Sequence, residues 1–226
     1  MNIKKLFSLS WPVMLGMILQ TLLTSVDLFY ISKLGKDYAA AASLSNSSST
    51  VVFVLSSLVS AGAIALVSRS FGSSDEENVR TFSGISIILA VIIGTILGTL
   101  CFIFTKGILS VMFDPSPEVM ALGYSYLSVI FLGTFIVFLN SALRTILQAI
   151  GDTRTPLIIF GIANVLNIIL DPVFMFTLNY SIKGAAIATV ISNFIGCILI
   201  LGVIIKKVYK NKLNLFFSVG FQLQFQ

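Results

Sequence analysis

The chain of 226 residues is too apolar to fold as a water-soluble domain. Hydrophobic residues make up 57% of it and charged residues only 10%, whereas soluble domains carry about 25% charged residues. Its net charge of +5 comes from basic residues spread over several segments, which argues against a nucleic-acid-binding surface. The chain has no histidine, so the commonest general base and metal ligand is missing. These features predict an integral membrane protein.

Long apolar runs bounded by charged residues, glycine or proline predict transmembrane helices. A helix needs about 20 mainly apolar residues to cross a bilayer, and lipid leaves an open strand edge without hydrogen-bond partners. We therefore expect an all-α protein with six transmembrane helices, near residues 9–32, 46–68, 83–105, 121–146, 156–178 and 184–205. They form one domain, 1–212, which is followed by a short segment, 213–226.

The N-terminal segment is expected to stay in the mature protein as the start of the first helix. Lys4 and Lys5 precede an apolar run, which resembles a signal peptide. No small-residue cleavage site follows at a suitable distance, so an uncleaved helix is the better interpretation.

Basic residues at the ends of the apolar runs predict the orientation. With a cytoplasmic N-terminus, ten of them fall on the inner side, namely Lys4, Lys5, Arg69, Arg80, Arg144, Arg154, Lys206, Lys207, Lys210 and Lys212. Only four fall on the outer side, namely Lys33, Lys36, Lys106 and Lys183. This excess satisfies the positive-inside rule. It predicts a multi-pass protein of the plasma (inner) membrane with both termini in the cytoplasm.

Small residues recur within the predicted helices and indicate close packing. Gly94 and Gly98 have the GxxxG spacing, and the sixth helix begins with the small residues of 184–186. Cys101 and Cys197 each lie alone in an apolar segment, where a thiol usually packs as a small hydrophobic group. We expect a tight bundle without a cysteine-based metal site.

Asp27 and Asp171 are the acidic residues that lie deep within apolar runs. An ionised carboxylate at the bilayer centre costs about 3 kcal/mol or more, which makes each a candidate functional residue. The other seven acids lie in or beside predicted loops, namely Asp37, Asp75, Glu76, Glu77, Asp114, Glu118 and Asp152. Since every basic residue is expected in or at the edge of a loop, exchangeable cations are the natural partners of the two buried acids.

The fifth helix presents one polar face next to a proline. Asn164, Asn167 and Asp171 have the spacing i, i+3, i+7 and therefore share a side of the helix. Pro172 lacks a backbone N–H and is expected to kink the helix, which leaves the carbonyl of Ile168 without its usual partner. These groups could receive a cation or a water molecule.

The first and sixth helices carry further candidate cavity residues. Gln20 and Thr24 share a face with the acid of the first helix, and Pro12 predicts a kink before them. Thr189 and Asn193 are one turn apart in the sixth helix. For the amides and hydroxyls, a hydrogen bond between helices, worth about 0.6 kcal/mol, is an equally good explanation. A purely structural role explains the two acids less well, because it does not need a titratable group.

Several stretches resemble the first half of a multidrug and toxic compound extrusion (MATE) transporter, a family of the MOP superfamily. They are Trp11 and Pro12, Gln20 and Thr21, Val26 and Asp27, the loop 148–156 (QAIGDTRTP), 164–172 (NVLNIILDP) and 184–189 (GAAIAT).

The resemblance implies a six-helix lobe that binds a coupling cation, H+ or Na+. The ligands would be Asp27 of the first helix, Asn167 and Asp171 of the fifth, and Thr189 of the sixth. The implied activity is antiport, in which inward cation flow drives the export of organic, often cationic, drugs and toxic compounds, with neither enzymatic catalysis nor a cofactor. The sequence leaves the substrate and the choice between H+ and Na+ open.

Family members have two such lobes, whereas six helices are expected here. We therefore expect a second lobe from the same chain, from a second copy or from a separate chain, and interpret 213–226 as a cytoplasmic tail or the start of an interlobe linker.

A non-transporting fragment is an alternative function. A lipid-linked oligosaccharide flippase is another, disfavoured because no embedded basic residue is expected to meet a pyrophosphate. An intramembrane enzyme that uses Asp27 and Asp171 is a third, but no Gly-x-Gly-Asp protease motif surrounds either acid.

Overall fold

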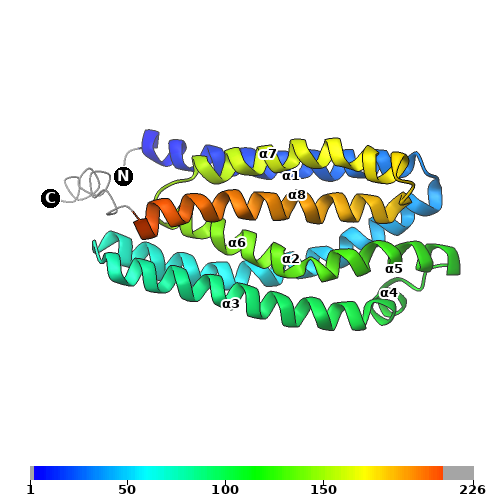
Figure 1. The fold of residues 1–226 in the computed structure, drawn as a ribbon, viewed down its shortest axis with the longest axis horizontal. Helices are drawn as coiled ribbons and strands as arrows, with labels where there is room; N and C mark the ends of the chain where they lie inside the picture. Colours follow the sequence, from blue (N-terminus) through cyan, green and yellow to red (C-terminus); the bar gives the residue numbers. More distant parts are fainter. Residues whose placement is uncertain (1–2, 211–226) are drawn as a thin grey trace.

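The described part of the chain is a bundle of long helices lying side by side (Figure 1). The computed structural model describes residues 3–210, with the side chains of 10–209, and contains no strand within that range. The α-helices are α1 Ile3–Ser32, α2 Lys36–Gly72, α3 Glu76–Ile103, α4 Thr105–Phe113, α5 Pro117–Leu132, α6 Thr134–Ala149, α7 Arg154–Pro172 and α8 Ser181–Ile204. Two wider π-helical segments follow α7 and α8, namely η1 Val173–Thr177 and η2 Ile205–Lys210.

Six membrane-spanning segments account for the bundle, as the sequence predicts. Five are helices long and apolar enough to cross a bilayer by themselves. The sixth, predicted as one helix over 121–146, is instead the pair α5 and α6, which meet at Gly133 with a bend of 47°. A Cβ on Gly133 would lie 2.7 Å from Cγ2 of Val190 on α8, so the bend brings the backbone against α8 where a larger side chain does not fit.

The observed α2 is longer than the predicted segment 46–68, because hydropathy undervalues its serine-rich start. Its Ser43, Ser45 and Ser47 hydroxyls donate to the carbonyls of residues four positions earlier. A serine bonded in this way leaves the backbone helical and hides its own hydroxyl. The nine-residue helix α4 also lies where the sequence analysis expected a loop.

Five spans form a ring, and α3 covers its outside. Around the ring α1 contacts α7, α7 contacts α8, α8 contacts α6, α6 contacts α2, and α2 contacts α1, while α3 packs on α2 and α6. Figure 1 shows that α1 begins and η2 ends at the same end of the bundle, which we call the proximal end; the α1–α2 and α7–α8 connections lie at the distal end.

Close helix contacts confirm the expected packing role of the small residues on α3. A Cβ on Gly94 would lie 2.7 Å from Cα of Phe135, and a Cβ on Gly98 would lie 2.6 Å from the carbonyl oxygen of Phe131. Backbone atoms cannot move away as a flexible side chain can. Only glycine at these two positions therefore permits the observed approach of α3 to α5 and α6.

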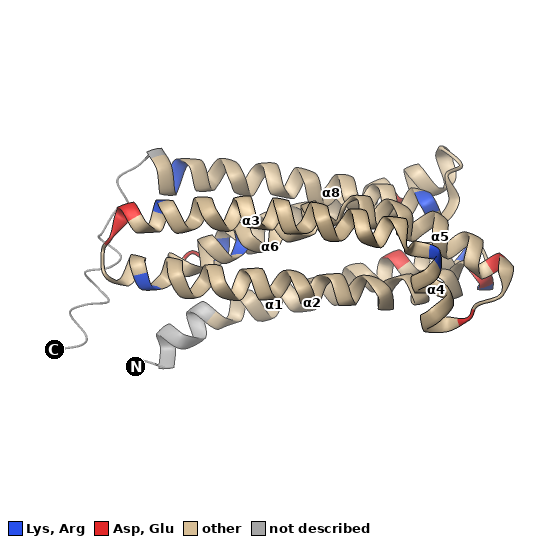
Figure 2. Ribbon diagram, turned by 90° about the horizontal axis from the view of Figure 1, so that it is seen from below, with Lys and Arg blue, Asp and Glu red and all other residues tan. Residues whose placement is uncertain are grey.

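Charged residues gather at the two ends of the bundle, leaving its long middle mostly uncharged (Figure 2). At the proximal end Lys207 of η2 pairs with Asp152 in the α6–α7 connection at 2.5 Å. Burial alone would raise the pKa of Asp152, but hydrogen bonds from Lys207 and Thr155 hold it below its usual value. This pair fastens the end of α8 to the loop that joins α6 and α7.

Candidate functional site

Two carboxyl groups meet inside the bundle. Asp171 on α7 is completely buried and Asp27 on α1 is partly buried, and their side chains lie within hydrogen-bonding reach of each other. Oδ1 of Asp27 and Oδ2 of Asp171 have no hydrogen-bond partner among the described residues. Two ionised carboxylates at this separation repel each other, so a proton or another cation between them is needed to stabilise the pair.

An amide and a hydroxyl complete this group. Nδ2 of Asn167 donates to Oδ1 of Asp171 at 3.2 Å and reaches Oγ1 of Thr189 on α8 at 3.5 Å. Oδ1 of Asn167 is a third buried acceptor without a described partner. The structure thus brings together the four residues named from the sequence as cation ligands, and it leaves three acceptor oxygens open among them.

The chain after Asp171 is held tightly against α8. Beyond Pro172 the helix continues as the wider turn η1 instead of ending in a loop. Gly184 lets α8 approach this turn, because a Cβ there would lie 2.7 Å from the carbonyl carbon and oxygen of Phe174. α1 runs through Pro12 as one helix, and the kink expected there stays a prediction.

The four further cavity candidates fall into two pairs. Asn164 is 7% exposed with Nδ2 unpartnered, and Nδ2 of the partly buried Asn193 donates to the carbonyl of Thr189 at 2.9 Å. Gln20 and Thr24 lie on the exposed surface of α1, where the Thr24 hydroxyl donates to the Gln20 carbonyl. The first pair therefore faces the interior of this lobe, and the second faces away from it.

Two neighbours of the site were missed in the sequence. Tyr126 on α5 is 5% exposed and lies close enough to both carboxyl groups to feel their charge. Nδ2 of Asn140 on α6 donates to the carbonyl and Oδ1 of Asn193 at 3.3 and 3.4 Å. Asn140 could have been found, because it begins a polar row at i, i+4, i+8 with Arg144 and Gln148. Tyr126 had no such signal.

The prediction that Arg144 lies in or at the edge of a loop is wrong. It lies within α6, and its guanidinium carbon stands 4.4 Å from the ring centre of Phe160 on α7. One basic side chain is therefore embedded in the bundle, and the argument against a flippase loses its premise. The error arose because the predicted helix ended at 146, too close to Arg144.

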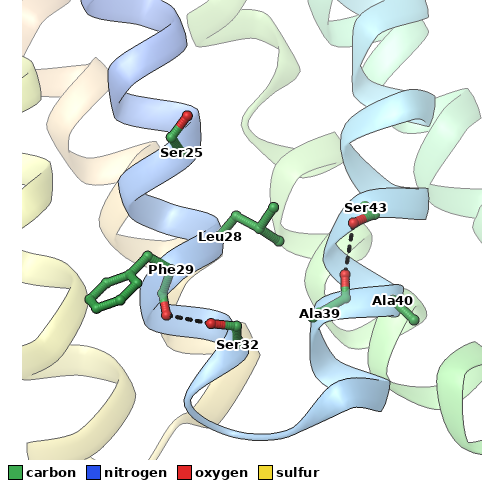
Figure 3. Close-up of a pocket in the computed structure, with 7 residues that line it drawn as sticks. All are labelled: Ser25, Leu28, Phe29, Ser32, Ala39, Ala40 and Ser43. Carbon is green, nitrogen blue, oxygen red and sulfur yellow. Dashed lines mark hydrogen bonds between the residues drawn. The ribbon is translucent and has the colours of Figure 1, made fainter.

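A groove of about 530 Å³ opens between α1 and α2 near the distal end, apart from the carboxyl pair (Figure 3). Its three hydroxyl groups all bond within their own helices, from Ser25 to the Thr21 carbonyl, Ser32 to Phe29 and Ser43 to Ala39. The remaining lining is apolar apart from backbone atoms. Because its hydroxyls are already bonded, the groove offers little polar chemistry.

Comparison with known families decides the assignment. The family model described as MatE matches residues 12–173, which include both acids and most of the bundle. The chain belongs to the MatE family. The matched range covers α7 with Asn167 and Asp171, and the resemblance seen in the sequence is confirmed.

Individual relatives of this MatE chain are described as multidrug proteins. A probable multidrug resistance protein NorM of Thermotoga maritima is 29% identical over 208 residues, which cover 90% of this chain and 45% of the relative. A multidrug export protein MepA of Staphylococcus haemolyticus is 30% identical over 193 residues, covering 85% and 42%. The chain thus spans about half the length of these relatives.

Solved structures agree with the fold. An outward-facing multidrug resistance MATE transporter superposes with a TM-score of 0.82 at 29% identity, covering 87% of this chain and 44% of the other. A MOP superfamily transporter from Pyrococcus furiosus, described as having a binding pocket of reverse polarity, superposes at 0.84 with 28% identity, covering 91% and 45%. The MatE chain is thus a multi-pass membrane protein whose relatives are transporters and not enzymes in the usual sense.

Proposed function

We propose that the chain is one lobe of a cation-coupled antiporter that exports organic, often cationic, compounds. The single observation that carries this proposal is the set of open acceptors at the carboxyl pair. Oδ1 of Asp27, Oδ1 of Asn167 and Oδ2 of Asp171 are buried without described partners. A site of oxygen acceptors suits H+ or Na+, and the multidrug relatives support an export role.

Binding of the cation would change the relative free energies of two access states. Without it, two adjacent carboxylates repel each other across α1 and α7, which favours an arrangement that separates these helices or admits water. With it, the pair becomes neutral or charge-balanced, and the closed packing of α1 on α7 is stabilised. A ligand shifts such an equilibrium only through its different affinity for the two states, and this pair provides that difference.

A second lobe would complete the substrate path. The exposed surface of α1 and α2 supports a second lobe, because its polar side chains would be poorly placed against lipid. They belong to Gln20, Thr21, Thr24, Ser43, Ser47, Thr50 and Ser57. In the proposal this surface borders the path between lobes, with the second lobe in the same chain, in a second copy or in a separate chain. Gln20 and Thr24 would then line the shared path.

The proposed location is the plasma membrane, with the proximal end in the cytoplasm. The excess of basic residues near that end supports this orientation. A cysteine-reactive tag added at the N-terminus should be labelled only after the cells are made permeable. Labelling in intact cells would contradict the orientation.

Replacing Asp171 tests the function. In proteoliposomes that contain the protein and a fluorescent organic cation, Asp171→Asn should abolish gradient-driven efflux while leaving membrane insertion unchanged, because the amide cannot gain and lose the coupling charge. Asp114→Asn, at an exposed acid beyond α4, is the matched control and should transport normally. Wild-type efflux in the Asp171 variant would refute the assigned role. Imposing a pH gradient or a Na+ gradient separately would identify the coupling ion.

A further inference from the structure

The short helix α4 lies across the distal end of the bundle. Both ribbon views show it turned out of the line of α3 (Figures 1 and 2), and it packs on α5, on α2 and on the end of α3. At the turn the Thr105 hydroxyl donates to the carbonyls of Cys101 and Phe102 at 2.8 Å each, so these carbonyls at the end of α3 have partners. The nine residues of α4 rise only about 14 Å, which is too short to cross a bilayer.

One face of α4 is buried against the bundle. Thr105 and Leu109, four residues apart, are both buried. A Cβ on Gly123 of α5 would lie 3.3 Å from Cδ1 of Leu109, so α5 approaches this face closely. The buried face fixes the rotation of α4 about its axis and thereby the direction of its other side chains.

The two flanks beside the buried face differ in polarity. At about 3.6 residues per turn, Lys106 and Ser110 fall on one flank, and Ile108 and Val111 fall on the other. Nζ of Lys106 lies 5.2 Å from the ring centre of Tyr124 on α5. Val111 is 87% exposed, the highest value among the large hydrophobic side chains of residues 10–209. The exposed half of α4 is therefore amphipathic.

The apolar flank of α4 continues an exposed apolar row on α3. This row recurs every three or four residues, at Ile92, Ile96, Leu100 and Ile103. On a membrane-spanning helix that covers the outside of the ring, such a row faces lipid. Phe104, which caps α4 and is 61% exposed, has the spacing i, i+4, i+7 with Ile108 and Val111. The apolar flank thus begins where the row on α3 ends.

The length of α3 puts this flank at the boundary of the hydrocarbon. Arg80 is the last charged residue before Lys106. The uncharged part of α3, residues 81–103, rises about 34 Å, and the hydrocarbon core of a bilayer is about 30 Å thick. The core therefore ends close to the end of α3, at the level of α4.

We propose that α4 is an interfacial anchor whose apolar flank, formed by Phe104, Ile108 and Val111, lies in the bilayer surface at the distal end. The other flank, with Lys106 and Ser110, faces the headgroups and water. A helix of this kind buries its apolar face about 5–10 Å into the boundary between headgroups and acyl chains. In the proposed orientation this is the outer leaflet.

Lipid, and not a second lobe, is the partner of this flank. The exposed polar surface proposed to meet a second lobe lies on α1 and α2. The apolar flank instead continues the exposed row of α3, on the outside of the ring. Anchoring there holds the end of α3 and the start of α5 at one depth. The inference concerns the membrane alone and does not depend on the export function.

Nitroxide spin labels test the proposal in vesicles of phosphatidylcholine and phosphatidylglycerol. Single cysteines are introduced into a Cys101→Ala, Cys197→Ala background. Power saturation then compares collisions with oxygen, which is enriched in lipid, and with a water-soluble nickel chelate present on both sides of the membrane. A label on Val111→Cys should collide more with oxygen than with the chelate. A label on the matched control Ser110→Cys, on the polar flank, should show the opposite order.

A third label calibrates the depth. Ile92 lies eleven residues before Ile103, which is about 16 Å of helix rise and about half of the hydrocarbon thickness. A label on Ile92→Cys should therefore lie near the bilayer centre and give the highest ratio of oxygen to chelate collisions. The ratio for Val111→Cys should fall between those of Ile92→Cys and Ser110→Cys.

Tryptophan fluorescence gives an independent measurement if the cysteine-free protein does not fold. Trp11 is the only tryptophan of the chain, so the double variant Trp11→Phe, Phe104→Trp carries one reporter on the apolar flank. Lipid brominated near the headgroup end of its acyl chains should quench this reporter more than lipid brominated near the chain ends, as expected for a depth of about 5–10 Å. Aqueous iodide should quench it only weakly.

Two outcomes would overturn the inference. More collisions with the chelate than with oxygen at Val111→Cys, or strong iodide quenching of Phe104→Trp, would place the flank in water. Few collisions with either reagent, or a reporter that neither iodide nor brominated lipid quenches, would show that protein covers the flank, from a second lobe or a second copy. Both outcomes leave the Asp171→Asn test of the export function unaffected.

Discussion

Two sides of the bundle bury polar atoms in different ways. On the packing side, formed by α2, α3 and α6, serine hydroxyls bond within their own helices or across to a neighbour, as Ser60 does to the Ser56 carbonyl and to Ser141. On the open side, formed by α1, α7 and α8, Asn164, Asn167 and both acids keep atoms without described partners. Unused hydrogen-bonding capacity, and not polarity alone, therefore distinguishes the candidate binding site from a polar contact between helices.

The packing side has an exception, because Oγ of Ser83 on α3 is also buried without a described partner. Oγ of Ser192 on α8 is in the same state, but it lies on the open side. A hydroxyl can rotate and is small, so an isolated one is a smaller cost than an amide or a carboxylate. The concentration of charged and amide groups on the open side is what sets it apart.

The largest expected effect is on the packing side. Gly98→Leu should prevent folding or lower the melting temperature sharply, because a Cβ there would already lie 2.6 Å from the Phe131 carbonyl oxygen and 3.0 Å from Cβ of Thr134. Overpacking typically costs about 1–3 kcal/mol, and more where backbone atoms must move. Gly62→Leu is the control, because nothing lies within 4 Å of the position of its Cβ. Size-exclusion profiles and thermal unfolding in detergent measure both, and equal behaviour of the two variants would contradict the packing account.

A smaller effect of opposite sign is expected on the open side. Asn164→Leu should raise the melting temperature, because it removes a buried donor whose unpaired state costs about 1–3 kcal/mol. Asn140→Leu should lower it, since that amide donates to Asn193. Thermal unfolding without substrate tests the pair. If both variants were destabilised to the same extent, Asn164 would have a partner after all, and the contrast between the two sides would weaken.

The smallest effect should come from the single hydroxyl contact between α2 and α6. Ser141→Ala removes the 2.7 Å bond to Ser60 and should cost about 0.6 kcal/mol, the usual value for such bonds in membrane proteins. Ser57→Ala is the matched control, because this exposed hydroxyl bonds only to the Val54 carbonyl of its own helix. A loss above about 2 kcal/mol would show that α2 and α6 depend on this bond far more than the packing account allows.

Much of the fold followed from apolar length alone. All six spans lie where the apolar runs predicted them, because a membrane admits few alternatives to helices of that length. The two main errors have different causes. The serine-rich start of α2 was taken for a loop because its local hydropathy is low. The bend at Gly133 could not be foreseen, because the close contact at this position is with Val190 of a helix that is distant in sequence.

The candidate site was predicted in part. Spacing along α7 put Asn164, Asn167 and Asp171 on one face, and the structure buries all three. Spacing gave no information on Tyr126, whose place near the acids depends on how α5 packs against α2 and α8. The burial of Arg144 was likewise hidden, because a residue near the end of a predicted helix can face either water or protein.

The sequence by itself determined the class of protein, the number of spans, and the two acids that lie deep within apolar runs. These depend on composition and on periodicity along one helix, which are local properties. Only the tertiary structure decided that the two carboxyl groups face each other, that Gln20 and Thr24 point away from them, and that Arg144 stacks on Phe160 inside the bundle. Those facts depend on how separate helices rotate and approach one another, and side-chain packing across the bundle sets that geometry.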